Sequence, residues 1–314
     1  MGEIVLNAKQ QRAIENIRKN PANFKRYYPE NQFEELALEA IKLDEDNFLH
    51  VAPELLLSFD FNDKAVDANP MVLKHLAQHE VTEQRYLKAV EKNPRSFLYV
   101  PQKYKTDELM KDVLTRDGAV LEHIEKPTEE MKWLALKSNS KAIRFIDKPT
   151  EEMVLYAVKD NGINIKYIEN PSREVSLEAV KNVKYELRST KMIYQFGILK
   201  YIKEQTEEIC LESVKRCGLS LKYANFKTKE VCAEAIKNDI KATIYVPEMT
   251  EDLQLIAVEQ SPESIESFHN PSEKVCLRAI EKDWSVIQYI DKQTPEICMS
   301  AYQQNPEAEK YFKL

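Results

Sequence analysis

The chain has 314 residues, among them 5 Gly and 14 Pro, and 31% of its residues are charged. Glycine lets a backbone approach a ligand closely and form tight loops. A chain this poor in glycine has little material for the phosphate-binding loops and nucleophile turns of many enzymes. Its hydrophobic content of 43% is sufficient for a buried core and argues against intrinsic disorder.

The net charge of −7 belongs to one end of the chain. Residues 248–314 contain 6 Lys/Arg and 13 Asp/Glu, whereas residues 1–247 contain 39 of each sign. This distribution argues against a globally basic nucleic-acid binder. No apolar run approaches the roughly 20 residues of a membrane helix, and the N-terminus has no secretory pattern. We therefore expect a cytoplasmic protein with no membrane contact.

An internal repeat runs through nearly the whole sequence. Four longer and weaker copies begin near Lys9, Phe33, Ser58 and Thr82. Nine regular copies follow, and they begin at Thr106, Thr128, Thr150, Ser172, Thr206, Thr228, Thr250, Ser272 and Thr294. The regular copies are about 22 residues long, a length typical of stacked repeat architectures. The copy at Ser172 is the exception, because the next copy does not begin until Thr206.

The first half of each copy predicts an α-helix. Thr or Ser at position 1 can cap the helix, and acidic residues at positions 2 and 3 suit the positive end of its dipole. Position 4 is apolar, position 8 small and position 9 aliphatic, as in Met153, Ala157 and Val158. These residues lie on one stripe of a helix of about three turns that spans positions 2–11.

The second half predicts a turn and a shorter helix. Position 12 is usually Asn or Asp and position 13 is often Pro or Gly, as in Asn161 and Gly162. Such a pair ends the first helix and starts the second. Apolar residues at positions 16 and 19 then flank an aromatic at position 18, as in Ile165, Tyr167 and Ile168.

A single copy is too small to bury its own apolar face, and stacking of neighbours solves this problem. We therefore predict an all-α solenoid of about 13 two-helix repeats, each of about 22–25 residues, forming a single domain over residues 1–314. Irregular, weaker repeats span residues 9–105. Regular repeats span residues 106–314, with an insertion near residues 183–194.

Several segments resemble a known repeat family. They are the Thr-Glu-Glu start, Ala157-Val158-Lys159, Ala179-Val180-Lys181, Lys92-Asn93-Pro94 and Tyr167-Ile168. They resemble short α-helical tandem repeats of similar length, found in bacterial, phage and large-virus proteins and described as domains of unknown function. The resemblance implies the solenoid fold and carries no activity or catalytic residues.

Four cysteines form a ladder at position 5, namely Cys210, Cys232, Cys276 and Cys298. Neighbouring helices pack about 8–10 Å apart, which is too far for one metal ion or a ready disulfide. We predict buried thiols. Together with Cys217 at position 12, these five reduced cysteines fit a reducing cytoplasm.

Histidine and tyrosine fill the aromatic position of the repeat. His50, His75 and His123 stand at position 18, and the i, i+4 pair of His75 and His79 could in principle bind a metal. We favour a structural role and predict no metal, no cofactor and no catalytic residues. Tyrosine occupies position 18 at Tyr99, Tyr167, Tyr201, Tyr223, Tyr245, Tyr289 and Tyr311. Packing explains this row, and a stacking surface for nucleic acid is the alternative.

Basic residues form two rows. Position 10 is basic in five successive copies, at Lys137, Lys159, Lys181, Lys215 and Lys237. Position 17 is basic in four, at Arg144, Lys166, Lys200 and Lys222. One interpretation is a solvated helix end whose lysines pair with Glu178, Glu212 or Glu234. The other is a basic strip that contacts an acidic protein surface or phosphates.

The insertion near residues 183–194 is a second candidate surface, because solenoid insertions often lie on a binding face. Its candidate contact residues are Lys184, Tyr185, Arg188, Lys191 and Tyr194. Tyr and Arg are frequent interface anchors. A lengthened helix with no role is the alternative.

Three functional hypotheses follow. The first is a non-enzymatic scaffold that binds another protein, by fold analogy a viral or bacterial regulator or inhibitor of a host protein. The second is a binder of a phosphate-rich ligand, either nucleic acid or a nucleotide, along the basic strip. The third is an enzyme whose site is assembled across repeats.

Overall fold

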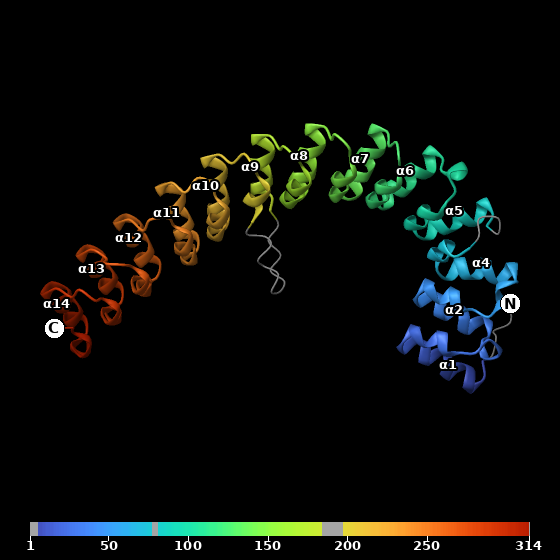
Figure 1. Ribbon diagram of the computed structural model, residues 1–314, viewed down its shortest axis with the longest axis horizontal. Coiled ribbons are helices and arrows are strands. Elements are labelled where there is room, and N and C mark those ends of the chain that lie inside the picture. The colour runs from blue at the N-terminus through green and yellow to red at the C-terminus, as the bar shows by residue number, and fades with distance from the viewer. Residues whose placement is uncertain (1–5, 77–80, 184–196, 314) are drawn as a thin grey trace. The chain divides into compact units, whose positions relative to one another are not determined.

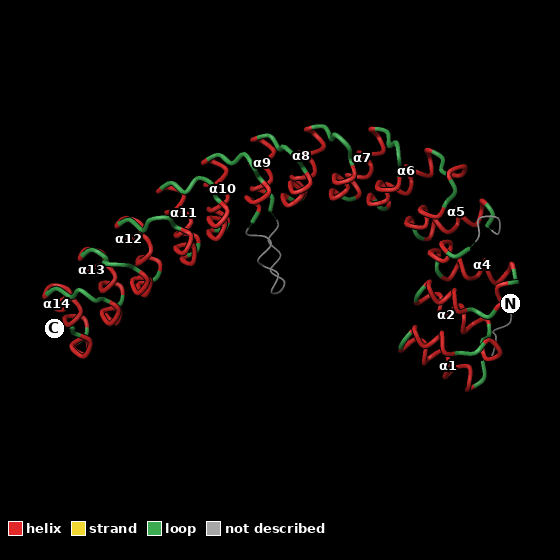
Figure 2. The backbone as a smooth tube through the Cα atoms, in the orientation of Figure 1, coloured by secondary structure: helices red, strands yellow, loops and turns green. Residues whose placement is uncertain are grey.

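A computed structural model describes residues 6–76, 81–183 and 197–313. Throughout these ranges the regular structure is helical, and Figure 2 shows helices joined by loops without a strand. By its internal contacts the chain divides into two compact units, residues 1–147 and residues 148–314. The prediction of a single domain is not tested by this division.

The first unit contains the helices α1 to α7. Its α-helices are α1 (Ala8–Lys19), α2 (Glu34–Leu43), α3 (Pro53–Leu56), α4 (Phe59–Ala68), α5 (Glu83–Lys92), α6 (Asp107–Arg116) and α7 (Glu129–Ser138). Its 3-10 helices are η1 (Pro21–Arg26), η2 (Pro29–Asn31), η3 (Glu45–His50), η4 (Pro70–Lys74), η6 (Pro94–Tyr99), η7 (Gln102–Tyr104), η8 (Gly118–His123) and η9 (Ser140–Phe145).

The second unit contains α8 to α14, which follow one another along the ribbon in Figure 1. Its α-helices are α8 (Glu151–Asp160), α9 (Arg173–Lys181), α10 (Glu207–Arg216), α11 (Lys229–Asn238), α12 (Glu251–Gln260), α13 (Glu273–Lys282) and α14 (Pro295–Gln304). Its 3-10 helices are η10 (Gly162–Tyr167), η12 (Ile198–Tyr201), η13 (Gly218–Tyr223), η14 (Ile240–Tyr245), η15 (Pro262–Ser267), η16 (Trp284–Tyr289) and η17 (Pro306–Tyr311).

The repeat positions predict these bounds closely. In α6, α7, α8 and α10 to α14 the helix occupies positions 2–11, which confirms the expected first helix. The expected second helix is also present, and in most copies it is a short 3-10 helix such as η10. So short a run can form few i→i+4 bonds, so the tighter i→i+3 geometry satisfies more of its backbone.

Two capping residues mark the ends of α8. The Thr150 hydroxyl accepts a hydrogen bond of 3.3 Å from the backbone N–H of Met153. At the other end Asn161 is extended, with φ of −153°. Its backbone N–H donates to the Ala157 carbonyl at 3.1 Å, and its side-chain oxygen accepts from the N–H of Ile163 at 3.2 Å. One residue therefore ends the α-helix and starts the 3-10 helix.

The helices of the second unit form two layers. Successive α-helices contact one another from α8 to α14, and η10, η12, η13 and η14 contact one another in the same order. The residues at positions 4, 8 and 9 lie between the layers, and Val275, Ala279 and Ile280 in α13 are fully buried or nearly so. These apolar side chains are buried against the neighbouring helices, and this burial stabilises the stack.

Glycine at position 13 permits close approach between copies. A Cβ on Gly162 would lie 1.9 Å from the carbonyl oxygen of Ala179 in the next α-helix. Gly118 meets Ala135 in the same way. None of the glycines in the described ranges has positive φ, so their role is to leave space for a neighbouring backbone.

The longer N-terminal copies use their extra residues in additional short helices. The additional turns η2, α3 and η7 each follow the 3-10 helix of one of these longer copies. The first copy also begins earlier than expected. Asn7, rather than Lys9, caps α1, and it exchanges 3.0 Å hydrogen bonds with Gln10 in a capping box.

Candidate partner-binding surface

The basic residues at position 17 lie on the 3-10 helices, each next to the aromatic residue that ends its helix. All four are exposed. Each cationic group lies 4.3–5.3 Å from the centroid of that ring, in the pairs Arg144–Phe145, Lys166–Tyr167, Lys200–Tyr201 and Lys222–Tyr223. A cation–π contact at an exposed site contributes about 0.5–1 kcal/mol. The contact therefore restrains the position of a charge that stays accessible.

Two of these lysines form no ion pair with the residues that the structure describes. Among the residues that the structure describes, neither Lys166 nor Lys222 has a carboxylate partner. Their exposed ammonium groups are held over tyrosine rings by the fold. Within the described ranges, these groups have no ion pair to break before they bind an anion.

The basic residues at position 10 lie on the α-helices, and all of them are exposed. Lys237 forms the expected ion pair with Glu234, at 2.7 Å. The other acidic residues have different partners: Glu212 pairs with Arg216 at 3.1 Å, and Glu178 accepts a 2.7 Å hydrogen bond from Asn182. The row also contains four more exposed lysines, which are Lys137, Lys159, Lys181 and Lys215.

Ion pairs between neighbouring helices make the α-helical layer mixed in charge near its C-terminal end. Lys282 pairs with Glu259 at 2.7 Å, and Arg278 pairs with the same carboxylate. The hydrogen bond from Arg278 is the main cause of a lowered pKa of the Glu259 carboxyl, and the hydrogen bond from Lys282 lowers this pKa further. Lys274 lies 3.5 Å from Glu251. Several charged side chains of the α-helical layer therefore form ion pairs that join neighbouring helices.

The inserted segment near residues 183–194 is described only at Val183, which is buried. Its candidate residues lie outside the described ranges, and they are Lys184, Tyr185, Arg188, Lys191 and Tyr194.

The prediction of buried thiols is confirmed for three of the four cysteines of the ladder. Cys210, Cys232 and Cys276 are buried, and Cys298 is partly exposed. Each thiol points to the residue five places earlier; Cys210 Sγ, for example, donates to the side-chain oxygen of Gln205 at 3.2 Å. Burial raises the pKa of the Cys276 thiol to about 11. A thiol with a raised pKa is a poor nucleophile and a poor metal ligand.

The histidines have packing contacts or exposed positions. His75 stacks on Phe48, with ring centroids 6.1 Å apart, and its Nε2 lies 3.1 Å from Asp46. His123 is exposed, and His79 lies outside the described ranges. In the described part of the chain, no group of three or more His, Cys, Asp or Glu residues could hold a metal ion.

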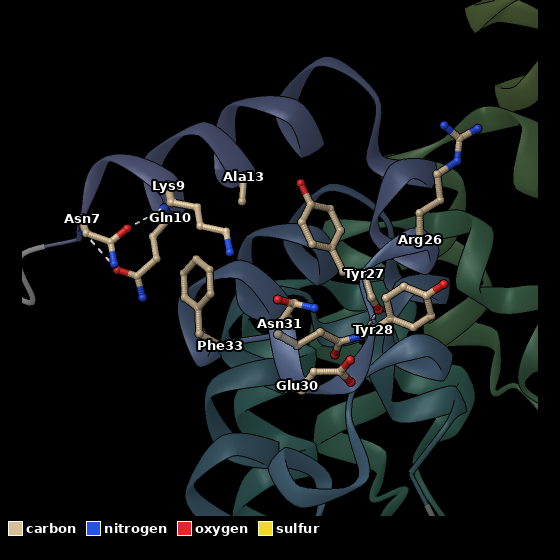
Figure 3. Close-up of a pocket in the computed structure, with 11 residues that line it drawn as sticks. Asn7, Lys9, Gln10, Ala13, Arg26, Tyr27, Tyr28, Glu30, Asn31 and Phe33 are labelled. Carbon is tan, nitrogen blue, oxygen red and sulfur yellow. Dashed lines mark hydrogen bonds between the residues drawn. The ribbon is translucent and has the colours of Figure 1, made fainter.

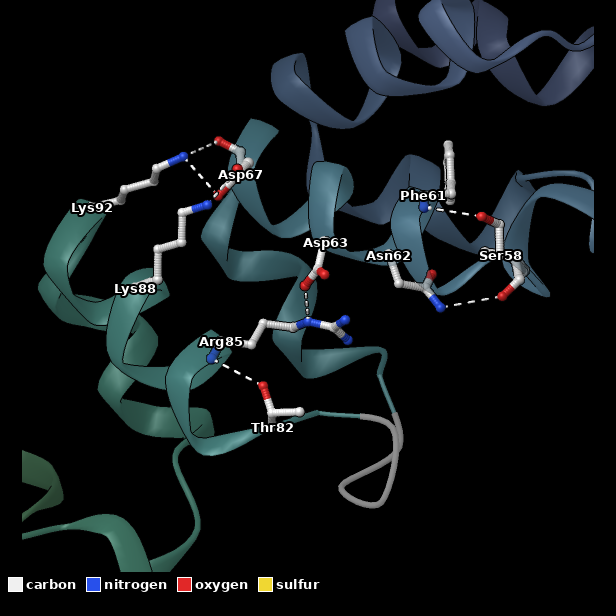
Figure 4. Close-up of polar contacts among 10 residues, drawn as sticks. Ser58, Phe61, Asn62, Asp63, Asp67, Thr82, Arg85, Lys88 and Lys92 are labelled. Atoms are coloured by element: carbon white, nitrogen blue, oxygen red, sulfur yellow. Dashed lines mark hydrogen bonds and ion pairs between the residues drawn. The ribbon is translucent and has the colours of Figure 1, made fainter.

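Arg85 is a buried cation that the repeat pattern does not predict. It stands at position 4 of its copy, where other copies have an apolar residue, and it is 4% exposed. Its Nε pairs with Asp63 on α4, and its guanidinium lies 4.3 Å from the centroid of the Phe59 ring. Figure 4 shows Arg85 reaching from α5 to Asp63, beside the pairs of Lys88 and Lys92 with Asp67. A charged residue in an apolar repeat position is the signal that could have revealed this contact.

Glutamine at position 22 bridges neighbouring copies, and sequence reasoning also missed this role. Gln205 Nε2 donates to the carbonyls of Leu199 and Tyr223 at 2.9 and 3.0 Å. Its Oε1 accepts from the backbone N–H of Asn225 at 2.8 Å. Gln293 makes the equivalent bridge from η16 to η17. The side chain therefore fixes the spacing of two successive 3-10 helices.

A pocket of about 360 Å³ lies beside α1 in the first unit. Lys9, Tyr27 and Phe33 face it in Figure 3, whereas Arg26 points away. Three of its amide side chains have partners in the fold: Asn7 and Gln10 cap α1, and Gln32 donates to the His50 carbonyl at 2.8 Å. The pocket offers shape and aromatic surface rather than a catalytic set.

Two further hollows have different characters. One, of about 280 Å³, has both charged and apolar residues in its lining and lies over the 3-10 helices of the first unit, where Arg95 pairs with Asp117 at 3.0 Å. The other, of about 370 Å³, is apolar and lies on α14, where Met299 is 57% exposed. Neither hollow combines an acid, a base and a nucleophile.

None of the helices in the described ranges is long and apolar enough to cross a membrane. Comparisons of the chain with protein-family models, with curated proteins and with solved structures find no match. The resemblance to short bacterial and viral repeats therefore stays a prediction.

Proposed function

We propose that the chain is one α-solenoid of about 13 repeats that acts as a non-enzymatic scaffold and binds another protein. The repeat pattern that spans the sequence supports the solenoid. The recurring helix bounds of the regular copies and the contacts of successive α-helices in the second unit support it further.

The observation that carries the proposed function is the series of exposed cations on the 3-10 helices. Lys166, Lys200 and Lys222 recur at one position of three successive copies, each beside a tyrosine ring. Repeated positions on stacked copies form a row. A row of restrained, accessible cations suits an acidic protein surface, because complementary charge increases association rate and specificity.

The proposed function can be tested by affinity purification with the tagged full chain from its native cells. We expect a protein partner to be retained by the wild-type chain and by the control variant Lys274→Glu/Lys292→Glu. We expect the row variant Lys166→Glu/Lys222→Glu, which has the same change in net charge, to retain at least tenfold less. Equal retention by the two variants would contradict a role for the row.

A phosphate-rich ligand is the second candidate, and the pairing of lysine with tyrosine favours it. Lysine neutralises phosphates and tyrosine rings can stack on bases. This candidate predicts binding of single-stranded nucleic acid or nucleotide that weakens steeply with salt. A filter-binding titration without retention of DNA, RNA or nucleotide at low salt would exclude it.

A further inference from the structure

We propose that Lys166, Lys200, Lys222 and Ile244 bind an extended acidic peptide in the polyproline II conformation. The peptide has three acidic residues spaced three positions apart, and an apolar residue three positions after the last of them. This inference rests on the proposed function as a protein-binding scaffold and specifies the chemistry of the partner.

The four residues occupy one place in four successive 3-10 helices. Each is the residue before the last of its helix, in η10, η12, η13 and η14. These helices contact one another in that order. Helices in contact lie about 8–10 Å apart, so a straight ligand that follows the row meets a new side chain at this interval.

Polyproline II geometry matches this interval. It has three residues per turn and rises about 3.1 Å per residue, so every third side chain returns to the same side after about 9.3 Å. A β-strand returns a side chain to the same side after two residues, or about 6.7 Å. Every second side chain of a strand would therefore fall out of step with the row.

Each cation is held close to its own 3-10 helix. Their ammonium groups lie 4.6–5.3 Å from the rings of the tyrosines that follow them. Gln205 donates to the Leu199 carbonyl, just before Lys200, and to the Tyr223 carbonyl, just after Lys222. The bridge thus fixes η12 relative to η13. Less conformational freedom is then lost when a ligand binds.

The fourth place in the row is apolar. Ile244 stands where the three previous copies have lysine, and it is 73% exposed. The next residue, Tyr245, accepts a 3.1 Å hydrogen bond from Lys227 at its carbonyl, so η14 is tied to the preceding copy. An exposed isoleucine at a binding position favours an apolar side chain on the ligand. A nucleic acid has a phosphate on every nucleotide, so it would also place a charge opposite this apolar residue.

The experiment is fluorescence anisotropy with the full chain and labelled synthetic peptides at low ionic strength. The matched peptide is three Glu-Pro-Pro triplets followed by Leu, used in both sequence directions because the row does not fix the orientation. The control has the same composition with the three Glu adjacent. We expect one direction of the matched peptide to bind at least tenfold more tightly than the control. Equal binding would show that net charge alone decides, and the inference would be wrong.

A change of preference at the fourth place tests the register directly. Ile244 is exposed, so Ile244→Lys leaves the core intact, and circular dichroism can verify the fold. This variant should prefer a peptide with Glu in place of the final Leu, whereas the wild-type chain should prefer Leu. An unchanged preference would overturn the register. Tighter binding of a helical peptide with Glu at every seventh position, or of an oligonucleotide of equal charge, would overturn the proposed ligand class.

The outcomes separate this inference from the function on which it rests. A protein partner that is lost with Lys166→Glu/Lys222→Glu, together with no preference among the peptides, would refute the peptide register and leave the scaffold function in place. Failure of both experiments would refute both.

Discussion

At the scale of single residues, close contacts between backbones determine how neighbouring copies fit. Gly162 has no Cβ, and the carbonyl of Ala179 occupies the space where one would lie. Position 8 is small for the same reason, since a larger side chain would separate the two helices. Gly162 and Ala179 therefore form one close contact between adjacent copies.

We predict that Gly162→Ala destabilises the second unit by about 1–3 kcal/mol, the usual effect of overpacking. The new Cβ would lie 1.9 Å from a backbone oxygen that cannot move without shifting α9. Gly197→Ala is the matched control, because its Cβ would meet only the side chains of Tyr223 and Lys200, at 3.2 and 3.3 Å. Denaturant unfolding should show a clearly larger loss for Gly162→Ala. Similar losses would contradict the proposed contact.

The Cys276 thiol predicts a dependence of stability on pH. Burial raises the pKa of this thiol from 9.0 to about 11, so the folded state holds its proton more tightly. The stabilising contribution is complete below about pH 9 and is lost as pH rises to about 11. We expect the wild-type chain to lose on the order of 2 kcal/mol more than Cys276→Ala across this window. Urea unfolding between pH 8 and pH 11 measures the difference, and parallel losses would argue against a buried neutral thiol.

Some residue roles could be predicted from the sequence and others could not. The thiols of the cysteine ladder were predictable, because a repeated position in a stack has a repeated environment. The roles of Arg85 and Gln205 were not. Arg85 depends on Asp63 one copy earlier, and Gln205 depends on two backbone carbonyls. These partners come from neighbouring copies. A charge at an apolar repeat position marks Arg85 in the sequence without identifying its partner, and the partners of Gln205 leave no pattern within one copy.

At the scale of helices, caps fix where each element begins and ends. Thr150 caps α8 through its hydroxyl, whereas the side chain of Thr250 makes no capping hydrogen bond at α12. Both threonines stand at position 1 and both are exposed. The pair therefore separates the effect of the cap from that of the residue type.

We predict that Thr150→Ala destabilises the first turn of α8 by about 1 kcal/mol, the usual value for a lost N-cap. Thr250→Ala should have a much smaller effect on α12. Amide hydrogen exchange measures the two helix starts separately in the folded chain. If the two substitutions accelerated exchange equally, the hydroxyl of Thr150 would not be the cap.

The bounds of the α-helices were predictable from sequence, and the type of the second helix was not. Thr at position 1 and Asn or Asp at position 12 are chemical signals that a reader can recognise. The choice of 3-10 over α geometry depends on how few residues remain after the turn, and apolar spacing at positions 16 and 19 fits both helix types. Likewise, the extra turn α3 is formed by the surplus residues of a longer copy.

At the scale of the whole molecule, stacked repeats transmit stability only to their neighbours. In the second unit, α13 contacts α12 and α14, and Ile280 of α13 is completely buried. Ile236 has the same position and the same burial in α11. A linear stack therefore predicts local consequences of a change in its core.

We predict that Ile280→Ala, which removes about 2–5 kcal/mol of core packing, increases hydrogen exchange mainly in α12, α13 and α14. Ile236→Ala should move the region of faster exchange to α10, α11 and α12. Mass spectrometry of peptic fragments can locate both regions. Uniform acceleration over the second unit in both variants would indicate one cooperative core instead of a stack.

The place of each row residue near the end of a 3-10 helix also bears on how such a chain can grow. Lys166, for example, owes its position to Tyr167 and to the caps of its own copy. Duplication of one regular copy would therefore add one side chain to the row without disturbing the others. If the row binds a polyproline II peptide, each duplication extends the matching ligand by one turn of that helix. The length of the recognised sequence then changes in triplets, and a gene that gains or loses copies changes specificity in the same steps.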